Sequence, residues 1–223
     1  MTRFESLGLQ AVIFDMDGLI FDTERLYLHA WPHVGTVLGL PITLEDATTT
    51  VGRPLWECEP FFQTRYGSDF CMTKALDIMA GHIRTQLETN GMPLKPGVTA
   101  LLEHLREANI PTALGTSNIT SVVTAYLEAA DLTPYFSPIV TADMVESAKP
   151  APDIFQKAAA DLGLRPDQCL VLEDSNIGIA SAHKAGCLPV MVPDLLAPTA
   201  ETLTQVWGVF DHLGAVTETL FSP

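Results

Sequence analysis

The sequence predicts an α/β protein in which a parallel sheet covered by helices is interrupted by an all-helical insertion. Short apolar, β-prone runs alternate with amphipathic helix patterns along most of the 223 residues, which is typical of successive βαβ units. From residue 23 to about 91 the alternation stops and no strand pattern is found. The expected strands are 11–14, 112–115, 139–141, 169–172 and 190–192, and the expected helices of the sheet domain are 98–108, 119–130, 151–162 and 177–185.

This pattern indicates two domains. Residues 1–22 and 93–223 are expected to form the sheet domain, and residues 23–92 a helical domain inserted into it. The far boundary is marked by "NGMPLKPGV", which places two glycines and two prolines between the insertion and the returning sheet domain.

Composition limits the classes of partner. With 47% hydrophobic and 17% charged residues the chain is that of a folded globule, and its formal charge of −15 leaves no basic surface for nucleic acid or an anionic membrane. The N-terminus has no signal-peptide pattern, and no apolar run reaches the ~18 residues that a membrane span needs. We expect a cytoplasmic monomer that binds a small molecule, with its cysteines as free thiols.

Two acids, Asp15 and Asp17, follow the first apolar run directly. In open α/β sheets the ligand site lies at the carboxyl ends of the strands, and residues i and i+2 of an extended segment point to the same side. Lys149 precedes another expected helix. The other polar residues that follow expected strands are Thr116, Ser117, Asn118, Glu173 and Asp174. One site that takes residues from four loops is therefore expected.

Phosphoryl transfer is the chemistry that this combination suits. Clustered carboxylates repel one another unless a hard cation lies among them, and Mg²⁺ favours carboxylate, carbonyl and phosphate oxygens. With the charges shielded, one carboxylate can attack phosphorus and a second can transfer the proton. Lys149 and Thr116 can hold the charged oxygens.

The first motif, "DMDGLIFDTE", is close to the pattern D-x-D-G-x-x-x-D-[ST]-E. On this motif the chain resembles phosphatases of the haloacid dehalogenase superfamily that carry a helical cap. The segments "DTERLY", "KPAPDIF" and "MVPD" are similar to the branch with pseudouridine-5′-phosphatase and β-phosphoglucomutase-like enzymes. The resemblance implies a Rossmann-like core, Mg²⁺ and an aspartyl-phosphate intermediate.

The resemblance also implies roles for individual residues. Asp15 would be the nucleophile, and Asp17 the acid/base and a metal ligand through its backbone carbonyl. Asp174, in preference to Glu173, would complete the metal ligands. Thr116 and Lys149 would also act in catalysis. The residues expected to bind substrate are Thr116, Ser117, Asn118, Lys149, Tyr27 and, from the cap loop "VGRP", Arg53.

Three functions remain open: a phosphatase of a small phosphorylated metabolite, a sugar-phosphate mutase, and a catalytically silent binding protein on the same fold. Similar mutases carry a cap histidine four residues after the motif threonine, and here that position is Tyr27. A phenol with a pKa near 10 is a poor proton shuttle at pH 7, which favours hydrolysis. His29 and His33 have the spacing of a helical metal pair, but Pro32 is expected to disturb the helix between them.

Overall fold

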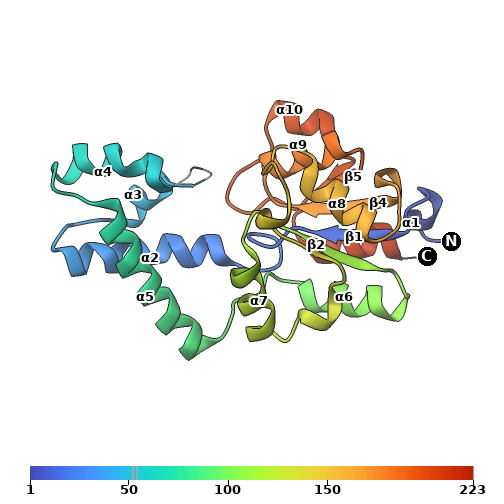
Figure 1. The fold of residues 1–223 in the computed structure, drawn as a ribbon, viewed down its shortest axis with the longest axis horizontal. Coiled ribbons are helices and arrows are strands. Elements are labelled where there is room, and N and C mark those ends of the chain that lie inside the picture. The colour runs from blue at the N-terminus through green and yellow to red at the C-terminus, as the bar shows by residue number, and fades with distance from the viewer. Residues whose placement is uncertain (52, 54, 223) are drawn as a thin grey trace. The chain divides into compact units, whose positions relative to one another are not determined.

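The computed structural model describes residues 1–51, 53 and 55–222. The chain divides into two compact units (Figure 1). We call Met1–Phe21 together with Leu94–Pro223 the core unit, and Asp22–Pro93 the inserted unit.

The core unit contains a six-stranded sheet in which every neighbouring pair is parallel, in the order β3-β2-β1-β4-β5-β6. After β1 the chain adds β2 and β3 on one side of it, and then crosses over to add β4, β5 and β6 on the other side. The strand order therefore reverses at β1, which is a topological switch point. The predicted α/β fold with a parallel sheet is confirmed. The strands are β1 (Ala11–Phe14), β2 (Thr112–Gly115), β3 (Ile139–Val140), β4 (Cys169–Glu173), β5 (Leu188–Met191) and β6 (Gly208–Val209).

The central strand β1 is apolar throughout because it is covered on both faces. All four of its residues are buried, and it pairs with β2 on one side and β4 on the other. Ile13 lies opposite Ala113 and Val171 in this register. A continuous apolar run is typical of a strand in such a position.

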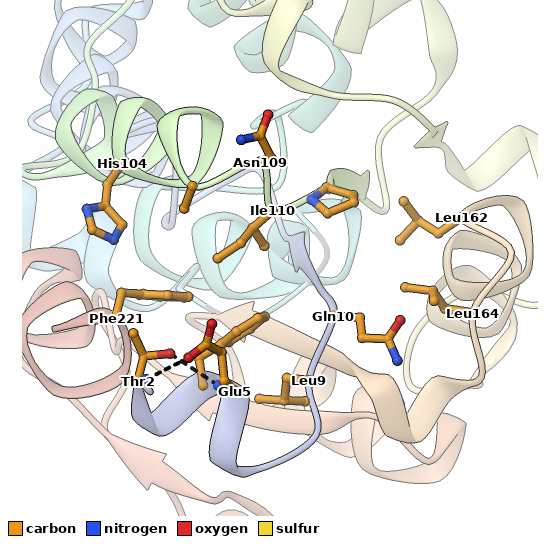
Figure 2. Close-up of a pocket in the computed structure, with 13 residues that line it drawn as sticks. Thr2, Glu5, Leu9, Gln10, His104, Asn109, Ile110, Leu162, Leu164 and Phe221 are labelled. Carbon is orange, nitrogen blue, oxygen red and sulfur yellow. Dashed lines mark hydrogen bonds between the residues drawn. The ribbon is translucent and has the colours of Figure 1, made fainter. Parts of the chain in front are cut away.

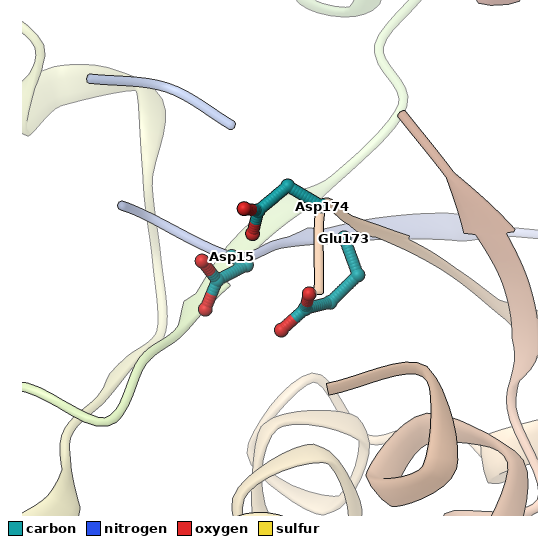
Figure 3. Close-up of side chains that lie close together, drawn as sticks. All are labelled: Asp15, Glu173 and Asp174. Carbon is teal, nitrogen blue, oxygen red and sulfur yellow. The ribbon is translucent and has the colours of Figure 1, made fainter. Parts of the chain in front are cut away.

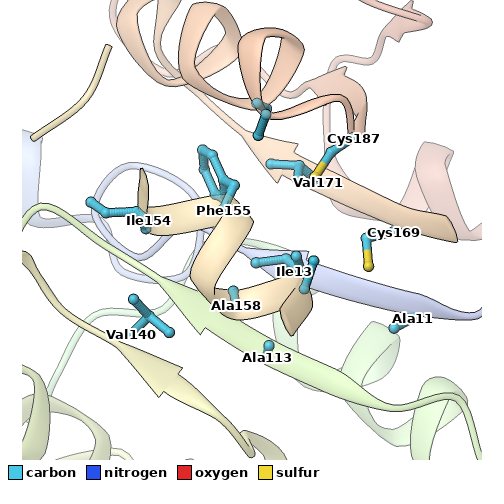
Figure 4. Close-up of a cluster of buried hydrophobic side chains, with 13 residues drawn as sticks. Ala11, Ile13, Ala113, Val140, Ile154, Phe155, Ala158, Cys169, Val171 and Cys187 are labelled. Atoms are coloured by element: carbon cyan, nitrogen blue, oxygen red, sulfur yellow. The ribbon is translucent and has the colours of Figure 1, made fainter. Parts of the chain in front are cut away.

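Helices follow the strands as the sequence pattern predicts. The main helices of the core unit are α6 (Val98–Glu107), α7 (Thr120–Ala129), α8 (Asp153–Asp161) and α9 (Asn176–Ala185). Side chains of α8 and α9 pack with those of β1, β2 and β4 in one buried cluster (Figure 4). The shorter elements are α1 (Arg3–Ser6), α10 (Ala200–Gln205), α11 (Leu213–Val216), a π-helix (Thr217–Phe221) and the 3-10 turns Thr133–Tyr135, Ala142–Met144 and Pro166–Gln168.

The inserted unit has a hydrophobic core of its own. The Trp31 ring stacks on Phe62 at 4.4 Å between centroids, and Phe62 stacks on Phe70 at 5.0 Å. Among its described residues the regular structure is helical, as predicted. Its helices are α2 (Thr23–Leu38), α3 (Leu44–Thr48), a 3-10 turn (Leu55–Cys58), α4 (Glu59–Tyr66) and α5 (Met72–Asn90).

The disturbance expected at Pro32 does not end the helix, because α2 continues through this residue. Proline removes one backbone donor, and here packing of the buried neighbours Trp31 and Val34 maintains the helix. His33 stacks on His82 of α5, with 4.0 Å between ring centroids. In the part of the chain that the structure describes, no helix has the length and apolar character required to cross a bilayer.

Asp46 joins the start of α3 to the end of α4 within the inserted unit. Its buried carboxylate accepts hydrogen bonds from the Thr43 hydroxyl at 2.6 Å and the Tyr66 hydroxyl at 2.6 Å, and pairs with Arg65. Burial alone would raise the pKa of Asp46, but the bonds from Thr43 and Tyr66, with the Arg65 charge, outweigh burial and hold this pKa below its ordinary value.

We therefore expect Asp46→Asn to lower the free energy of unfolding of the protein at pH 7 by about 1.5–3 kcal/mol, because bonds to a charged acceptor are lost. A depressed pKa contributes stability above the pKa of the unfolded chain, and this contribution is lost as pH falls through the folded value. The difference between variant and wild type should thus narrow from pH 5 toward pH 3. Urea unfolding across this range measures it, with the exposed Asp77→Asn as control. A gap that widened on acidification would contradict the prediction.

Candidate active site

Three carboxylates gather where β1 and β4 end (Figure 3). Asp15 follows β1 directly, Glu173 is the last residue of β4, and Asp174 comes next. One carboxylate oxygen from each lies within 4.8 Å of the other two. The register of the parallel strands brings these carboxylates together, since Phe14 of β1 lies opposite Leu172 of β4 and both strands end at the same edge of the sheet.

Lys149 lies between two of these acids. Its Nζ donates to Asp15 Oδ1 at 2.5 Å and to Glu173 Oε1 at 2.9 Å, and its side chain is 4% exposed. Burial raises the pKa of Asp15 above its ordinary value, against the opposing effect of Lys149. Burial would lower the pKa of Lys149, but Asp15 and Glu173 outweigh it and raise that pKa. The ammonium group therefore stays charged.

The segment that carries Lys149 is held by α9. The buried Ser181 hydroxyl donates to the Ala151 carbonyl at 2.6 Å, and Lys184 Nζ donates to the Pro150 carbonyl at 3.1 Å. These bonds fix the backbone on the two residues that follow Lys149. The position of Lys149 is thus set by a helix whose N-cap, Ser175, follows Glu173 and Asp174 in the chain.

Glu173 is fully engaged by protein groups. It is 1% exposed; Oε1 accepts from Lys149, while Oε2 accepts from the Ser175 N–H at 2.6 Å and the Ser175 hydroxyl at 2.9 Å. A Cβ on Gly178 would lie 1.6 Å from Glu173 Oε1, so the carboxylate occupies the space that a side chain on α9 would take. This arrangement makes Glu173 an anchor for Lys149.

We expect Gly178→Ala to displace Glu173 and to weaken both stability and turnover. Alanine is the better helix former, but its methyl group overlaps a buried carboxylate, and overpacking of this kind costs about 1–3 kcal/mol. The matched control is Gly81→Ala in α5, where a Cβ meets nothing within 4 Å and stability should rise by up to about 1 kcal/mol. Denaturant unfolding measures both changes. Equal stability of the two variants would contradict the prediction.

The other predicted residues of the core unit lie in the loops after β1 and β2. The side chain of Asp17 points to Asn118, whose amide donates to Asp17 Oδ2. Thr116 is buried, and its N–H donates to the Val140 carbonyl at 3.0 Å. Ser117 is exposed. The structure thus brings Asp15, Lys149, Glu173 and Asp174 together, and places Asp17 with Asn118 beside Thr116.

Tyr27 and Arg53 belong to the inserted unit, and both are exposed there. Tyr27 lies on α2, and Arg53 precedes the 3-10 turn at Leu55–Cys58. The remaining glycine and proline of the "VGRP" motif, at positions 52 and 54, lie outside the described residues.

The acid cluster fits a magnesium ion. Lys149 pairs with Asp15 and Glu173, and the oxygens of all three carboxylates lie close enough together to bind one hard cation, which favours carboxylate ligands. A Cβ on Gly18, whose φ is +76°, would lie 2.3 Å from Asp174 Oδ2, so the turn after β1 admits this carboxylate only because residue 18 is glycine. Since Glu173 is bound on both oxygens, Asp15 and Asp174 are the better donors.

A cavity of about 600 Å³ lies at the opposite, amino end of the sheet (Figure 2). It is lined by residues that precede strands, such as Gln10 before β1, Ile110 before β2 and Leu164 before β4. The acid in this lining, Glu5, is engaged in the cap of α1, where it accepts from the Thr2 N–H at 2.8 Å. We place no chemistry there, because ligands of parallel sheets bind at the carboxyl ends of the strands.

Comparison with known proteins agrees with this geometry. Residues 12–192 match the model of the haloacid dehalogenase-like hydrolase family, a range that includes every predicted site residue. The chain belongs to this family. Several relatives of this haloacid dehalogenase-like chain are named as phosphatases. The predicted family and enzyme class are therefore confirmed.

Two curated relatives and one solved structure illustrate the similarity. A fructose-1-phosphate phosphatase of Escherichia coli is 33% identical over 175 residues, which cover 78% of this chain and 92% of the relative. A pseudouridine-5′-phosphatase candidate of Drosophila melanogaster is 33% identical over 188 residues, 82% of this chain and 80% of the relative. A crystal structure of a β-phosphoglucomutase candidate from Thermotoga maritima superimposes with a TM-score of 0.82 at 28% identity, covering 95% of this chain and 100% of that one.

Sequence reasoning did not identify several residues that support the haloacid dehalogenase site. Ser175 binds Glu173, and Ser181 and Lys184 hold the Lys149 segment. Serine directly before an expected helix indicates an N-cap, and Ser175 does cap α9. No sequence signal distinguishes its additional bond to Glu173, which depends on how β4 meets α9.

Proposed function

We propose that the protein is a Mg²⁺-dependent phosphatase that hydrolyses a small phosphorylated metabolite, of the sugar phosphate or nucleoside monophosphate type, through an aspartyl-phosphate on Asp15. The observation that carries the proposal is the buried contact of Asp15 with Lys149 at the switch point of the sheet. The names of the relatives, a fructose-1-phosphate phosphatase and a hexitol phosphatase among them, support the substrate class.

In the first step a carboxylate oxygen of Asp15 attacks phosphorus, and the bond from phosphorus to the leaving oxygen breaks. Asp17, as general acid, gives its proton to that oxygen, so a neutral alcohol leaves. Lys149 Nζ and the Thr116 hydroxyl bind phosphoryl oxygens, and the ammonium charge offsets the charge of the attacked group.

In the second step a water molecule attacks the phosphorus of the aspartyl-phosphate while Asp17, now ionised, takes its proton. The bond between phosphorus and the Asp15 oxygen breaks, which releases phosphate and restores the carboxylate. Asp15, Asp174 and the backbone carbonyl of Asp17 would hold Mg²⁺. When bound, this ion shields the charge of the phosphate and of the nucleophile.

A sugar-phosphate mutase is the second candidate, since a structural neighbour is named as a β-phosphoglucomutase candidate. Tyr27, in the position where similar mutases carry a histidine, favours hydrolysis. A silent binding protein is disfavoured, because Asp15, Asp17 and Lys149 are all present. The roles of Tyr27 and Arg53 in substrate binding, the two domain ranges, and a cytoplasmic monomer stay predictions.

A substrate test separates phosphatase from mutase. We expect phosphate release to exceed isomerisation when the protein is given β-glucose 1-phosphate, Mg²⁺ and a trace of glucose 1,6-bisphosphate. Free phosphate and glucose 6-phosphate are measured in the same sample, beside a panel of sugar phosphates and nucleoside monophosphates with Mg²⁺. Faster formation of glucose 6-phosphate than of free phosphate would establish the mutase instead. Absence of turnover with every monoester would indicate the catalytically silent binding protein.

A further inference from the structure

Asn118 was expected to bind substrate, but its side chain contacts Asp17, the proposed general acid. Its side-chain amide donates to Asp17 Oδ2, although the two residues are 101 positions apart in the chain. Asn118 lies in the loop between β2 and α7, and Asp17 lies in the turn after β1. The contact exists because β1 and β2 are parallel neighbours whose carboxyl ends meet at one edge.

The backbone of Asn118 is held on both sides. Its N–H donates to the Thr116 hydroxyl oxygen at 3.1 Å, and its carbonyl accepts from the Ala142 N–H at 2.9 Å. The adjoining loops are joined as well, since Thr120 bonds to Thr141 at 2.8 Å and to Asp143 at 3.0 Å. The half-buried Asn118 amide is therefore presented to Asp17 from a rigid support.

The backbone of Asp17 is fixed by its own turn. The Gly18 N–H donates to the Phe21 carbonyl at 2.9 Å, and the Phe21 N–H donates to the Met16 carbonyl at 3.1 Å. These bonds restrain the main chain around Asp17 but leave the rotation of its carboxyl group to be set by side-chain contacts. The Asn118 amide supplies such a contact.

We propose that Asn118 is a positioning residue that orients the carboxyl group of Asp17 for proton transfer to the leaving oxygen. An N–H donor on Oδ2 favours Oδ2 as the carbonyl-type oxygen of the protonated acid, which places the transferable proton on Oδ1. The inference rests on the proposed function. The positioning role differs from the substrate-binding role expected of Asn118, because an amide that orients Asp17 changes the rate of the chemical step rather than the affinity for substrate.

Loss of a residue that positions Asp17 and loss of a residue that binds substrate depend differently on the leaving group. A sugar phosphate expels an alkoxide that needs a proton as the bond breaks, whereas 4-nitrophenyl phosphate expels a stable phenolate that needs little help. Loss of a correctly oriented acid therefore slows the first step, phosphoryl transfer to Asp15, selectively for the sugar phosphate, whereas any effect on the water step is the same for both esters. Loss of a substrate-binding group raises KM, and a general structural defect slows both substrates equally.

The experiment compares kcat and KM of wild type, Asn118→Ala and Asn118→Gln, with Mg²⁺, on 4-nitrophenyl phosphate and on the best sugar phosphate of the panel. We expect Asn118→Ala to lower kcat/KM for the sugar phosphate by about 10–100-fold and for 4-nitrophenyl phosphate by less than about threefold, because kcat/KM reports the steps up to departure of the leaving group and not the water step that both esters share. Asn118→Gln keeps the amide and should recover part of the difference. The exposed Thr124→Ala on α7 is the control and should behave as wild type.

The ratio of the two kcat/KM values within one sample does not depend on the folded fraction, so partial unfolding of a variant does not obscure the result. An unchanged ratio, or a rise in KM alone, would overturn the positioning role while the phosphatase function stands. A wild-type protein inactive on both esters would overturn the proposed function and, with it, this inference.

Discussion

Asp15→Asn is expected to abolish phosphate release, with kcat lower by about 10⁴-fold or more, because an amide is a poor nucleophile and a weak metal ligand. Acid quenching during wild-type turnover should trap a phosphoryl group on the peptide that contains Asp15, and mass spectrometry should find none in the variant. Excess chelator should stop release by wild type, and added Mg²⁺ should restore it.

The matched control is Asp161→Asn, which makes the same change at an exposed acid of α8 that pairs with Lys157 at 3.0 Å. It should retain wild-type turnover. A variant of Asp15 that still turned over, or turnover that persisted in chelator, would exclude the mechanism.

Lys149→Met is expected to affect both catalysis and stability. Removing one preorganised donor for the charged phosphoryl oxygens lowers kcat by about 10²–10³-fold. The same change leaves Asp15 and Glu173 buried without their shared cation, and the loss of one partner of a buried ion pair costs about 3–5 kcal/mol. Steady-state kinetics and urea unfolding, both at pH 7, measure the two effects.

Lys157→Met is the control for this substitution, since it removes an exposed lysine from the same part of the chain. Exposed ion pairs of this kind contribute about 0–1 kcal/mol, so stability and turnover should remain close to wild type. Equal losses in the two lysine variants would show that Lys149 has no special place in the site.

Much of the core fold could be predicted because its signals are local. The apolar run at 11–14, the acids that follow it and the helix patterns between the strands are each visible within a few residues. Shorter elements gave no such signal: β6 has two residues, Gly208–Val209, and exists only because it pairs with β5. Pro32 likewise does not end α2, since packing in the inserted unit outweighs the local preference of proline.

The place of the site could be inferred from the sequence for a geometric reason. Parallel strands joined by helices must all end at one edge, so Asp15, Lys149 and Asp174 could be assigned to one region without knowing the strand order. The family motif at residues 15–24 added the roles expected of them. Chain order was therefore enough to place these side chains at one edge of the sheet.

Which atoms bind one another was decided by the tertiary structure. Lys149 and Asp15 are 134 residues apart, and their contact depends on β1 lying beside β4 and on α9 holding the Lys149 segment. The anchoring of Glu173 by Ser175, and the contact of Asn118 with Asp17, likewise depend on side-chain rotamers and on burial. A sequence pattern specifies residue types and their spacing along the chain, but hydrogen bonds and pKa shifts depend on distances of a few ångströms that only the packed fold sets.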